Sequence, residues 1–340
     1  MIKFALALVA LLFIAAPASA ASFDCAKAAS PFEKAICSSP EVSAQDDILA
    51  KAYQTALGGL AADAANEIKS AQRAWLTYAE HSCSDDAQPI AGEYTDDQKA
   101  CLATTYRDRI GDLEASRMQG GYRFYPIDRY LVEKDTQALP EDFNKVADRQ
   151  FEIVKIDGTD DVSTAFNAAV DKIIAETPDL FEPGTTTIAG SDGTSDSDVK
   201  TTVSAVTSQR ITLQTNEYWY GHGAAHGNYF ITNRHFLLTE KRLLEASDIF
   251  EGDGWQDTLG QLALDGIKAK LGEDYFANSD DDVKAIAIDP LRWDFSDEGL
   301  VIQFNIYEVT AYAMGAPTLT IPWGDLSAIT TDRAEEIAYY

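Results

Sequence analysis

The chain has 340 residues, 46% of them hydrophobic, and its 55 acidic side chains outnumber 27 basic ones, which gives a formal net charge of −28. This length exceeds one typical domain, so two domains with buried cores are expected. Such an acidic surface repels phosphates, which argues against nucleic acid as a partner, and it attracts basic proteins. On charge alone, a protein that only has to stay soluble, or that is suited to a saline habitat, is the favoured explanation.

The first twenty residues have the pattern of a cleavable export signal. Lys3 precedes an apolar run over 4–16, and Ala18-Ser19-Ala20 provides the small-x-small site that signal peptidase cleaves. The run is shorter than the roughly 20 residues that span a bilayer. We therefore expect a signal peptide over 1–20, a mature chain that is not membrane-embedded, and a periplasmic or secreted location.

Four cysteines lie in the first third of the chain: Cys25, Cys37, Cys83 and Cys101. In an exported chain an even number of cysteines indicates disulfides. Three pairings are open, and the sequence spacings favour two local bridges. Zinc is the less favoured alternative, because no C-x-x-C pair is present.

The amino-terminal region has helical signals throughout. Ser30-Pro31-Phe32-Glu33 predicts a helix start, and Thr95-Asp96-Asp97-Gln98 predicts another. Apolar positions recur at helical spacing over 42–57, 63–83 and 101–113. We predict an all-α, disulfide-stapled helical hairpin bundle over residues 21–119.

Three segments of this region resemble a known family. They are S-P-E-V-S-A-Q-D-D at 39–47, Q-R-A-W-L at 72–76 and C-L-A-T-T-Y-R-D-R-I at 101–110. Together with the cysteines, they resemble the LprI-type lysozyme inhibitor domain over about 22–118. The resemblance implies a secreted helical domain that inhibits lysozyme in some members.

The loop over 84–97 is a candidate contact region in its own right. Exposed loops carry binding residues more often than helix faces that pack into a core. A bridge between Cys83 and Cys101 would present the loop on a constrained arm. Its candidate contact residues are Asp85, Asp86 and Glu93.

Beyond Gly120-Gly121 the pattern changes, and we place a domain boundary there. Amphipathic helices are expected over 162–175 and 255–271, and 183–197 has the composition of a loop. The expected strands cover 149–156, 199–206, 210–215, 228–238, 293–295, 300–306 and 318–321. The region 121–335 is therefore predicted to be an α+β domain with antiparallel strands and two helices.

His222 and His226 raise the possibility of a metal site, with His235 as a third ligand. Three glycines around them argue against a helix, and Gly223 stands where an H-E-x-x-H motif has its glutamate. A role in shaping or binding within the loop is favoured over a metal-dependent hydrolase. No G-x-S-x-G segment is present either, so no catalytic residue, metal or cofactor is predicted.

Further segments carry a second resemblance: E-Y-W-Y-G-H-G-A-A-H-G-N at 217–228, L-L-E-A-S-D-I-F at 243–250 and G-L-V-I-Q-F-N-I-Y-E-V-T-A-Y-A-M-G at 299–315. These resemble the RsiV-type extracellular domain, a domain of unknown function, over about 125–330. The resemblance implies lysozyme binding, with Tyr307, Glu308 and Tyr312 in the contacting segment. Packing in a core is an equal alternative for both tyrosines.

The two resemblances share one target. We predict an exported inhibitor that binds a basic lysozyme-type protein and covers its substrate cleft with loops. The alternative is a cell-envelope or peptidoglycan binding module without inhibitory activity. The oligomeric state is not predicted.

Overall fold

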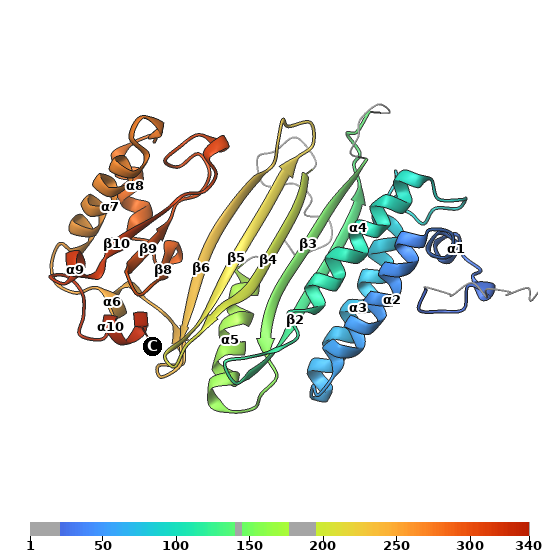
Figure 1. The fold of residues 1–340 in the computed structure, drawn as a ribbon, viewed down its shortest axis with the longest axis horizontal. Helices are drawn as coiled ribbons and strands as arrows, with labels where there is room; N and C mark the ends of the chain where they lie inside the picture. Colours follow the sequence, from blue (N-terminus) through green and yellow to red (C-terminus); the bar gives the residue numbers. More distant parts are fainter. Residues whose placement is uncertain (1–20, 140–144, 177–194, 340) are drawn as a thin grey trace, which may run out of the picture.

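A seven-stranded sheet occupies the middle of the molecule, with the amino-terminal helices at one end and a smaller carboxy-terminal unit at the other (Figure 1). The computed structural model describes residues 21–139, 145–176 and 195–339. The predicted signal peptide over 1–20 lies outside the described residues. This arrangement is the expected order of a helical region followed by an α+β region.

The helical region consists of α1 (Pro31–Ser38), α2 (Pro40–Leu57), α3 (Ala62–Ser82) and α4 (Asp96–Leu113). Ser30 and Thr95 each form a capping box with the residue three positions later, so the predicted helix starts are confirmed. The core of the region contains Trp75 and Tyr106, whose rings meet edge to face at 4.9 Å. Both tryptophan and tyrosine pack in the core, as their positions on the apolar stripes indicate.

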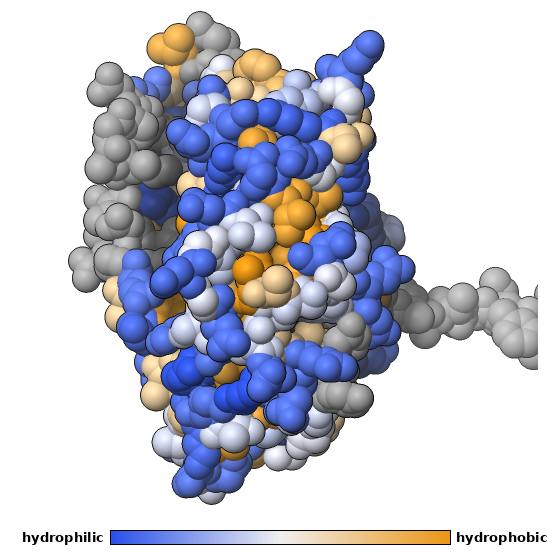
Figure 2. Space-filling model, turned by 90° about the vertical axis from the view of Figure 1, so that its left-hand side faces the viewer, coloured by the Kyte–Doolittle hydropathy of each residue, from blue (hydrophilic) through white to orange (hydrophobic). Residues whose placement is uncertain are grey.

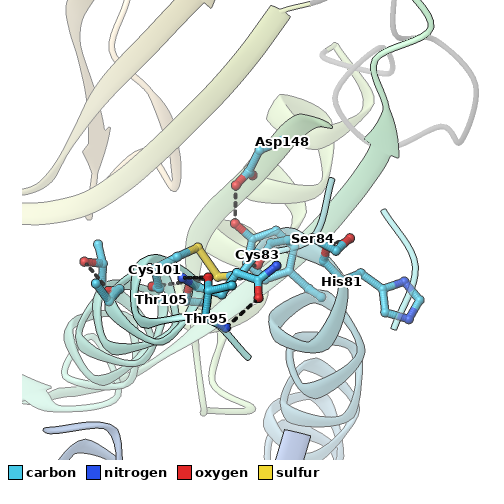
Figure 3. The surroundings of a disulfide bond; sticks show 12 residues. His81, Cys83, Ser84, Thr95, Cys101, Thr105 and Asp148 are labelled. Atoms are coloured by element: carbon cyan, nitrogen blue, oxygen red, sulfur yellow. Dashed lines mark hydrogen bonds between the residues drawn. A yellow bond between two sulfur atoms is a disulfide. The ribbon is translucent and has the colours of Figure 1, made fainter. Parts of the chain in front are cut away.

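Two disulfides staple this region: one joins the segment before α1 to α1, and the other joins the end of α3 to α4. Cys25 pairs with Cys37, and Cys83 at the end of α3 pairs with Cys101 inside α4 (Figure 3). This is the pairing that the spacing favoured. Each bridge closes a short loop, which stabilises the fold by about 3 kcal/mol through the entropy of the unfolded chain.

The large sheet has the strand order β1-β2-β3-β4-β5-β6-β7. Its strands are β1 (Met118–Gln119), β2 (Tyr122–Lys134), β3 (Val146–Ile156), β4 (Ser195–Val206), β5 (Arg210–Gly221), β6 (Asn228–Leu237) and β7 (Arg242–Leu243). Neighbours are antiparallel except β3 and β4, which are parallel and are separated in sequence by α5 (Asp161–Ala175). Most of the loop predicted over 183–197 lies outside the described residues, and its last three residues begin β4.

The two faces of the sheet differ in what covers them. On one face α5 places Phe166 and Val170 against Phe151, Val199 and neighbouring apolar side chains. On the other face α3 and α4 cover the β2 and β3 end, where the strands present charged residues. The aliphatic core and the charged contact with the helices are therefore on opposite sides of β3.

The carboxy-terminal unit pairs a three-stranded antiparallel sheet, β8 (Trp293–Phe295), β9 (Gly299–Gln303) and β10 (Thr318–Pro322), with α7 (Trp255–Leu271) and α8 (Asp280–Ala287). Shorter helices are α6 (Ala246–Ile249), α9 (Trp323–Leu326) and α10 (Ala334–Tyr339). Trp293 is fully buried at the centre of this core.

The outer surface of the carboxy-terminal unit is mainly hydrophilic, with apolar atoms in a small central area (Figure 2). Across the described ranges, no helix is both long and apolar enough to cross a membrane.

Candidate functional site

Five ring side chains gather on one face of the large sheet, near the turn between β5 and β6. We call this group the aromatic cluster; its members are Tyr218, His226, Tyr229, Tyr307 and Tyr312. Tyr218 and Tyr229 are directly paired in the register of β5 and β6, so they project from the same face. Tyr307 and Tyr312 come from the segment that follows β9. The cluster thus joins the sheet to the carboxy-terminal unit.

Four of the five rings are in contact, and Tyr218 adjoins them as the register partner of Tyr229. His226 stacks on Tyr312 with ring centroids 3.9 Å apart, and Tyr229 meets Tyr312 edge to face at 6.3 Å. His226 Nδ1 lies 3.0 Å from the carbonyl of Gly227, and its Nε2 lies 3.1 Å from the Tyr307 hydroxyl. A neutral ring that donates a hydrogen bond from Nδ1 can accept one from the Tyr307 hydroxyl at Nε2.

The backbone around Tyr307 is held in a defined conformation. Tyr307 has φ +63°, in the left-handed region, and its side chain is 46% exposed. The buried Asn305 side chain accepts a hydrogen bond from Ile231 N–H at 2.8 Å, which fixes the segment to β6. Glu308 accepts from Asn305 N–H at 2.6 Å and pairs with Arg292. The carboxylate of Glu308 therefore fixes the loop, and Tyr307 is the side chain that the loop presents.

His222 lies at the tip of the same hairpin but faces other partners. Its Nδ1 is 2.6 Å from Asp135 and its Nε2 is 3.0 Å from Asp196. Burial opposes a charge on the ring, but the hydrogen bonds to the two carboxylates outweigh it and raise the His222 pKa above its ordinary value. His222 thus connects the β5–β6 turn to the end of β2 and to β4.

The three histidines considered for a metal site have separate partners. His235 is buried, with its ring nitrogens 3.0 Å from Thr212 Oγ1 and 2.9 Å from the Trp293 carbonyl. Burial lowers the His235 pKa to about 3. In the part of the chain that the structure describes, no group of three His, Cys, Asp or Glu side chains is arranged to hold a metal ion. The structure thus brings His226 to Tyr307 and Tyr312, and does not bring the three histidines together.

The loop over 84–97, called the acidic loop below, belongs to the helical region and lies away from the turn between β5 and β6 that carries part of the aromatic cluster (Figure 1). Asp85, Asp86 and Glu93 are exposed, while Tyr94 is buried and anchors the loop. Ser84 Oγ donates to the His81 carbonyl at 2.8 Å and accepts from Gln88 N–H at 3.1 Å. The loop is a constrained acidic surface, separate from the ring surface.

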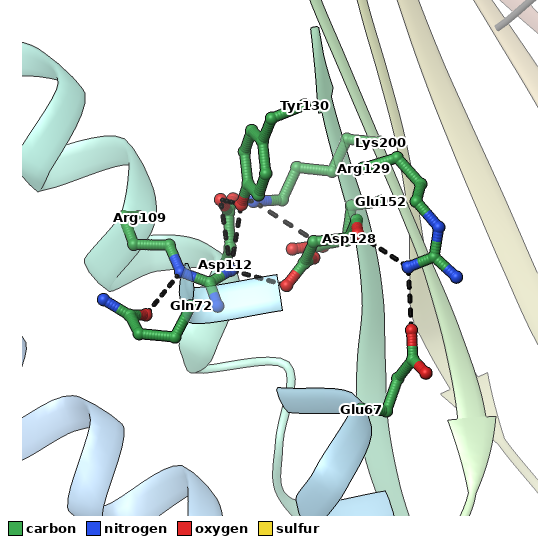
Figure 4. A network of polar contacts seen from close by, with 9 residues as sticks. All are labelled: Glu67, Gln72, Arg109, Asp112, Asp128, Arg129, Tyr130, Glu152 and Lys200. Atoms are coloured by element: carbon green, nitrogen blue, oxygen red, sulfur yellow. Dashed lines mark hydrogen bonds and ion pairs between the residues drawn. The ribbon is translucent and has the colours of Figure 1, made fainter. Parts of the chain in front are cut away.

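A buried charge network beneath α4 was not predicted (Figure 4). Arg109 is completely buried; it binds Asp128 of β2, donates to Gln72 at 3.0 Å and to the Tyr130 hydroxyl at 2.9 Å. On the neighbouring strands, Lys200 binds Asp112 at 2.7 Å. These contacts hold α4 on the sheet.

Comparisons with known families divide the chain in three. Residues 25–113 match the family of the lysozyme inhibitor LprI. Residues 247–324 match DUF3298, a protein family of unknown function. The LprI match extends from the first cysteine to the last residue of α4. The DUF3298 match includes Tyr307 and Tyr312 and ends in α9. The strands of the large sheet, from β1 to β7, lie between the two matches.

Two crystal structures of DUF3298 family proteins are similar to this chain. The one from Bacteroides fragilis NCTC 9343 covers 66% of this chain and 100% of its own, at 16% identity and a TM-score of 0.47. The one from Pseudomonas aeruginosa PAO1 covers 65% of this chain and 98% of its own, at 14% identity and a TM-score of 0.39. No curated protein matches the chain.

The LprI match and the two disulfides indicate an extracytoplasmic protein, because disulfides persist in oxidising compartments. In the aromatic cluster, sequence reasoning named His226, Tyr307 and Tyr312 but missed Tyr218 and Tyr229. The available signal was the alternation of E-Y-W-Y at 217–220, which places every second ring on one face of a strand.

Proposed function

We propose that this protein is exported to the periplasm or the medium, where it binds lysozyme-type muramidases and inhibits them. The observation that carries the proposal is the match of residues 25–113 to the lysozyme inhibitor LprI. The RsiV-type resemblance of the later region adds a second candidate lysozyme-binding surface to the same chain.

Charge and surface chemistry support this proposal. A net charge of −28 attracts a basic enzyme and speeds its encounter with the inhibitor. The aromatic cluster offers rigid rings with polar ends, the side-chain type that dominates binding energy in protein interfaces. In the proposed mechanism Tyr307, on its fixed loop, enters the substrate cleft of the lysozyme.

The test is an assay of peptidoglycan hydrolysis by animal-type and bacterial lysozymes, with the purified chain from Ala21 added at low and moderate salt. We expect inhibition and a detectable complex. The proposal is abandoned if no lysozyme is inhibited and no complex forms. Two sets of substitutions then locate the surface: Tyr307→Ser with Tyr312→Ser on the cluster, and Asp85→Asn, Asp86→Asn and Glu93→Gln on the acidic loop.

A matched control distinguishes contact from general loss of apolar surface. Ile48 on α2 is 46% exposed, the same fraction as Tyr307, and lies outside both candidate surfaces. Truncation of an anchoring aromatic residue weakens a complex by about 2 kcal/mol or more, which is a thirtyfold rise in Kd. Ile48→Ser should leave the Kd of the lysozyme complex unchanged. If it raises Kd as much as Tyr307→Ser does, the loss of affinity does not come from the aromatic cluster.

A second candidate function follows from the stacked rings. Exposed aromatic faces on a sheet are also suited to packing against the apolar faces of sugar rings, as in a peptidoglycan binding module. Sedimentation of the chain with insoluble peptidoglycan tests this. Retention by peptidoglycan that depends on Tyr312, combined with no effect on any lysozyme, would favour the module over the inhibitor.

A further inference from the structure

A groove lies between α4 and strands β3 and β4, on the sheet face that carries the aromatic cluster. It consists of a hollow of about 310 Å³ and an adjoining one of about 120 Å³, which share Gly111, Glu152 and Lys200 as lining residues. Asp108, Asp112 and Asp198 line the larger hollow. Asp108 and Asp198 are exposed at its rim, so solvent can enter it.

The groove contains more negative than positive charge. Four carboxylates and two cations, Lys200 and Arg107, line the larger hollow. Lys200 lies 2.7 Å from Asp112 and 3.6 Å from Glu152. The Arg107 guanidinium donates to the Ala103 carbonyl and to Thr104 on its own helix and pairs with Glu41, and its charge offsets part of the charge of Asp108.

The rim carboxylates show the effect of this excess. Although both residues reach solvent, the groove walls remove part of the hydration of their carboxylates, and this desolvation together with the charge of Asp112 raises the pKa of both Asp108 and Asp198, that of Asp198 to about 6. A further cation in the groove would relieve this repulsion.

Glu152 is the second and independent observation. It is 4% exposed, and within the described residues neither of its carboxylate oxygens accepts a hydrogen bond. Its register partners are Asp128 on β2 and Lys200 on β4, so it stands in a charged row that crosses three strands. Burial and the charges of Asp112 and Asp128 raise the Glu152 pKa well above its ordinary value, and Lys200 at 3.6 Å offsets them only in part. A cationic ligand that donates hydrogen bonds would stabilise the ionised carboxylate.

We propose that this groove binds an organic cation, whose ammonium or guanidinium group donates hydrogen bonds to Glu152 and lies between Asp108 and Asp198. The volume suits a small molecule or one side chain. A compact metal ion is a poorer fit, because no described group of side chains has metal-binding geometry. The cation is either a free amine or a Lys or Arg side chain of a protein partner.

Gly111 provides a means to close the groove. It is in the last turn of α4, and a Cβ added there would meet no atom within 4 Å. Glycine inside a helix costs about 1 kcal/mol relative to alanine, so a larger residue should be tolerated by the fold. Gly111→Leu would fill the space between the helix and the strands.

The test is calorimetric titration of the full chain with 1,4-diaminobutane and with agmatine at low salt, against the neutral isostere 1,4-butanediol. We expect both amines to bind and the diol to give no heat. Glu152→Gln should weaken amine binding about tenfold or more, because the amide cannot ionise to pair with the ammonium group. Gly111→Leu should abolish amine binding. Asp253→Asn removes one exposed charge elsewhere and should change nothing.

A second experiment measures complex formation with a basic lysozyme and distinguishes the two sources of the cation. If a protein side chain occupies the groove, Gly111→Leu weakens that complex and diaminobutane competes with it; if a free amine does, the complex is unaffected. Absence of amine binding together with an unchanged lysozyme complex overturns the proposal. So does equal weakening by Asp253→Asn and Glu152→Gln, which would indicate only diffuse attraction to an acidic surface. The amine titration contains no lysozyme, so its result is independent of the proposed function.

Discussion

Asp148 on β3 is a carboxyl group held under the helical region. It accepts a hydrogen bond from the Tyr78 hydroxyl of α3, and its own backbone N–H donates to Asp196 at 2.9 Å. Burial raises the Asp148 pKa to about 7, with the charge of Asp196 adding to the effect and the Tyr78 hydrogen bond opposing it. The contact between α3 and β3 thus contains a carboxyl group that titrates near neutral pH.

This pKa gives a pH dependence of stability with a defined sign. Between pH 4 and 7 the folded protein holds a proton on Asp148 that the unfolded chain has released, so this stabilisation is lost as pH rises through 7. The contribution of Asp148 to the free energy of unfolding is on the order of 4 kcal/mol. We expect Asp148→Asn, which keeps an acceptor for Tyr78, to remove it. Urea unfolding at pH 4.5 and 7.5 measures how the free energy of unfolding changes with pH. If this change is as large in Asp148→Asn as in the control Asp253→Asn, the assignment to Asp148 is wrong.

At the scale of elements, local signals were enough wherever a helix started or apolar spacing was regular. The caps at Ser30 and Thr95 marked the starts of α1 and α4, and the cysteine spacing indicated the pairing. The domain boundary near 120 stays a prediction. Strand β2 was missed because alternation assumes a solvated polar face, whereas Asp128 in this strand is buried beneath α4. Helix α8 was missed because its first turn consists of three aspartates, which are typical of a loop.

The candidate site was only partly visible for the same reason. His226 and Tyr312 were named as binding residues, but their stacking depends on a contact between a hairpin turn and a segment 86 positions later. The groove under α4 depends on Gly111, Glu152 and Lys200, which come from three elements. Local sequence patterns do not show which side chains meet when they are far apart in the chain. The sequence therefore predicts which residue types suit a site, but not which of them come together.

The contact between α4 and β2 is expected to depend on the Arg109–Asp128 pair. Removal of one partner leaves a buried charge without compensation, so Arg109→Met should destabilise the protein by about 3–5 kcal/mol. The double variant Arg109→Met with Asp128→Leu should recover most of that loss, because two apolar side chains replace the pair. Urea unfolding of both single variants and the double variant provides the cycle. A double variant no more stable than Arg109→Met would show that the packing of Arg109, and not its charge, holds the helix.

At the scale of the whole molecule, the polar sheet face links the two candidate sites. The register places Tyr130, Gln150, Asp198, Tyr218 and Tyr229 in one row across β2 to β6. The row begins under the helical region, passes the rim of the groove at Asp198 and ends in the aromatic cluster. A single partner on this face would therefore meet an acidic groove and a ring surface side by side, on a chain with a net charge of −28.

This arrangement predicts that charge and rings act on different rate constants of the proposed lysozyme complex. Long-range attraction acts during the encounter, so the association rate should fall about tenfold or more between about 20 mM and 200 mM salt, as the Debye length shortens. Contacts made by the rings act after docking, so Tyr307→Ser should raise the dissociation rate and keep the salt dependence of association. Surface plasmon resonance at several salt concentrations measures both. If salt changed only dissociation, or if Tyr307→Ser slowed association without affecting dissociation, the division of roles between the acidic surface and the cluster would be wrong.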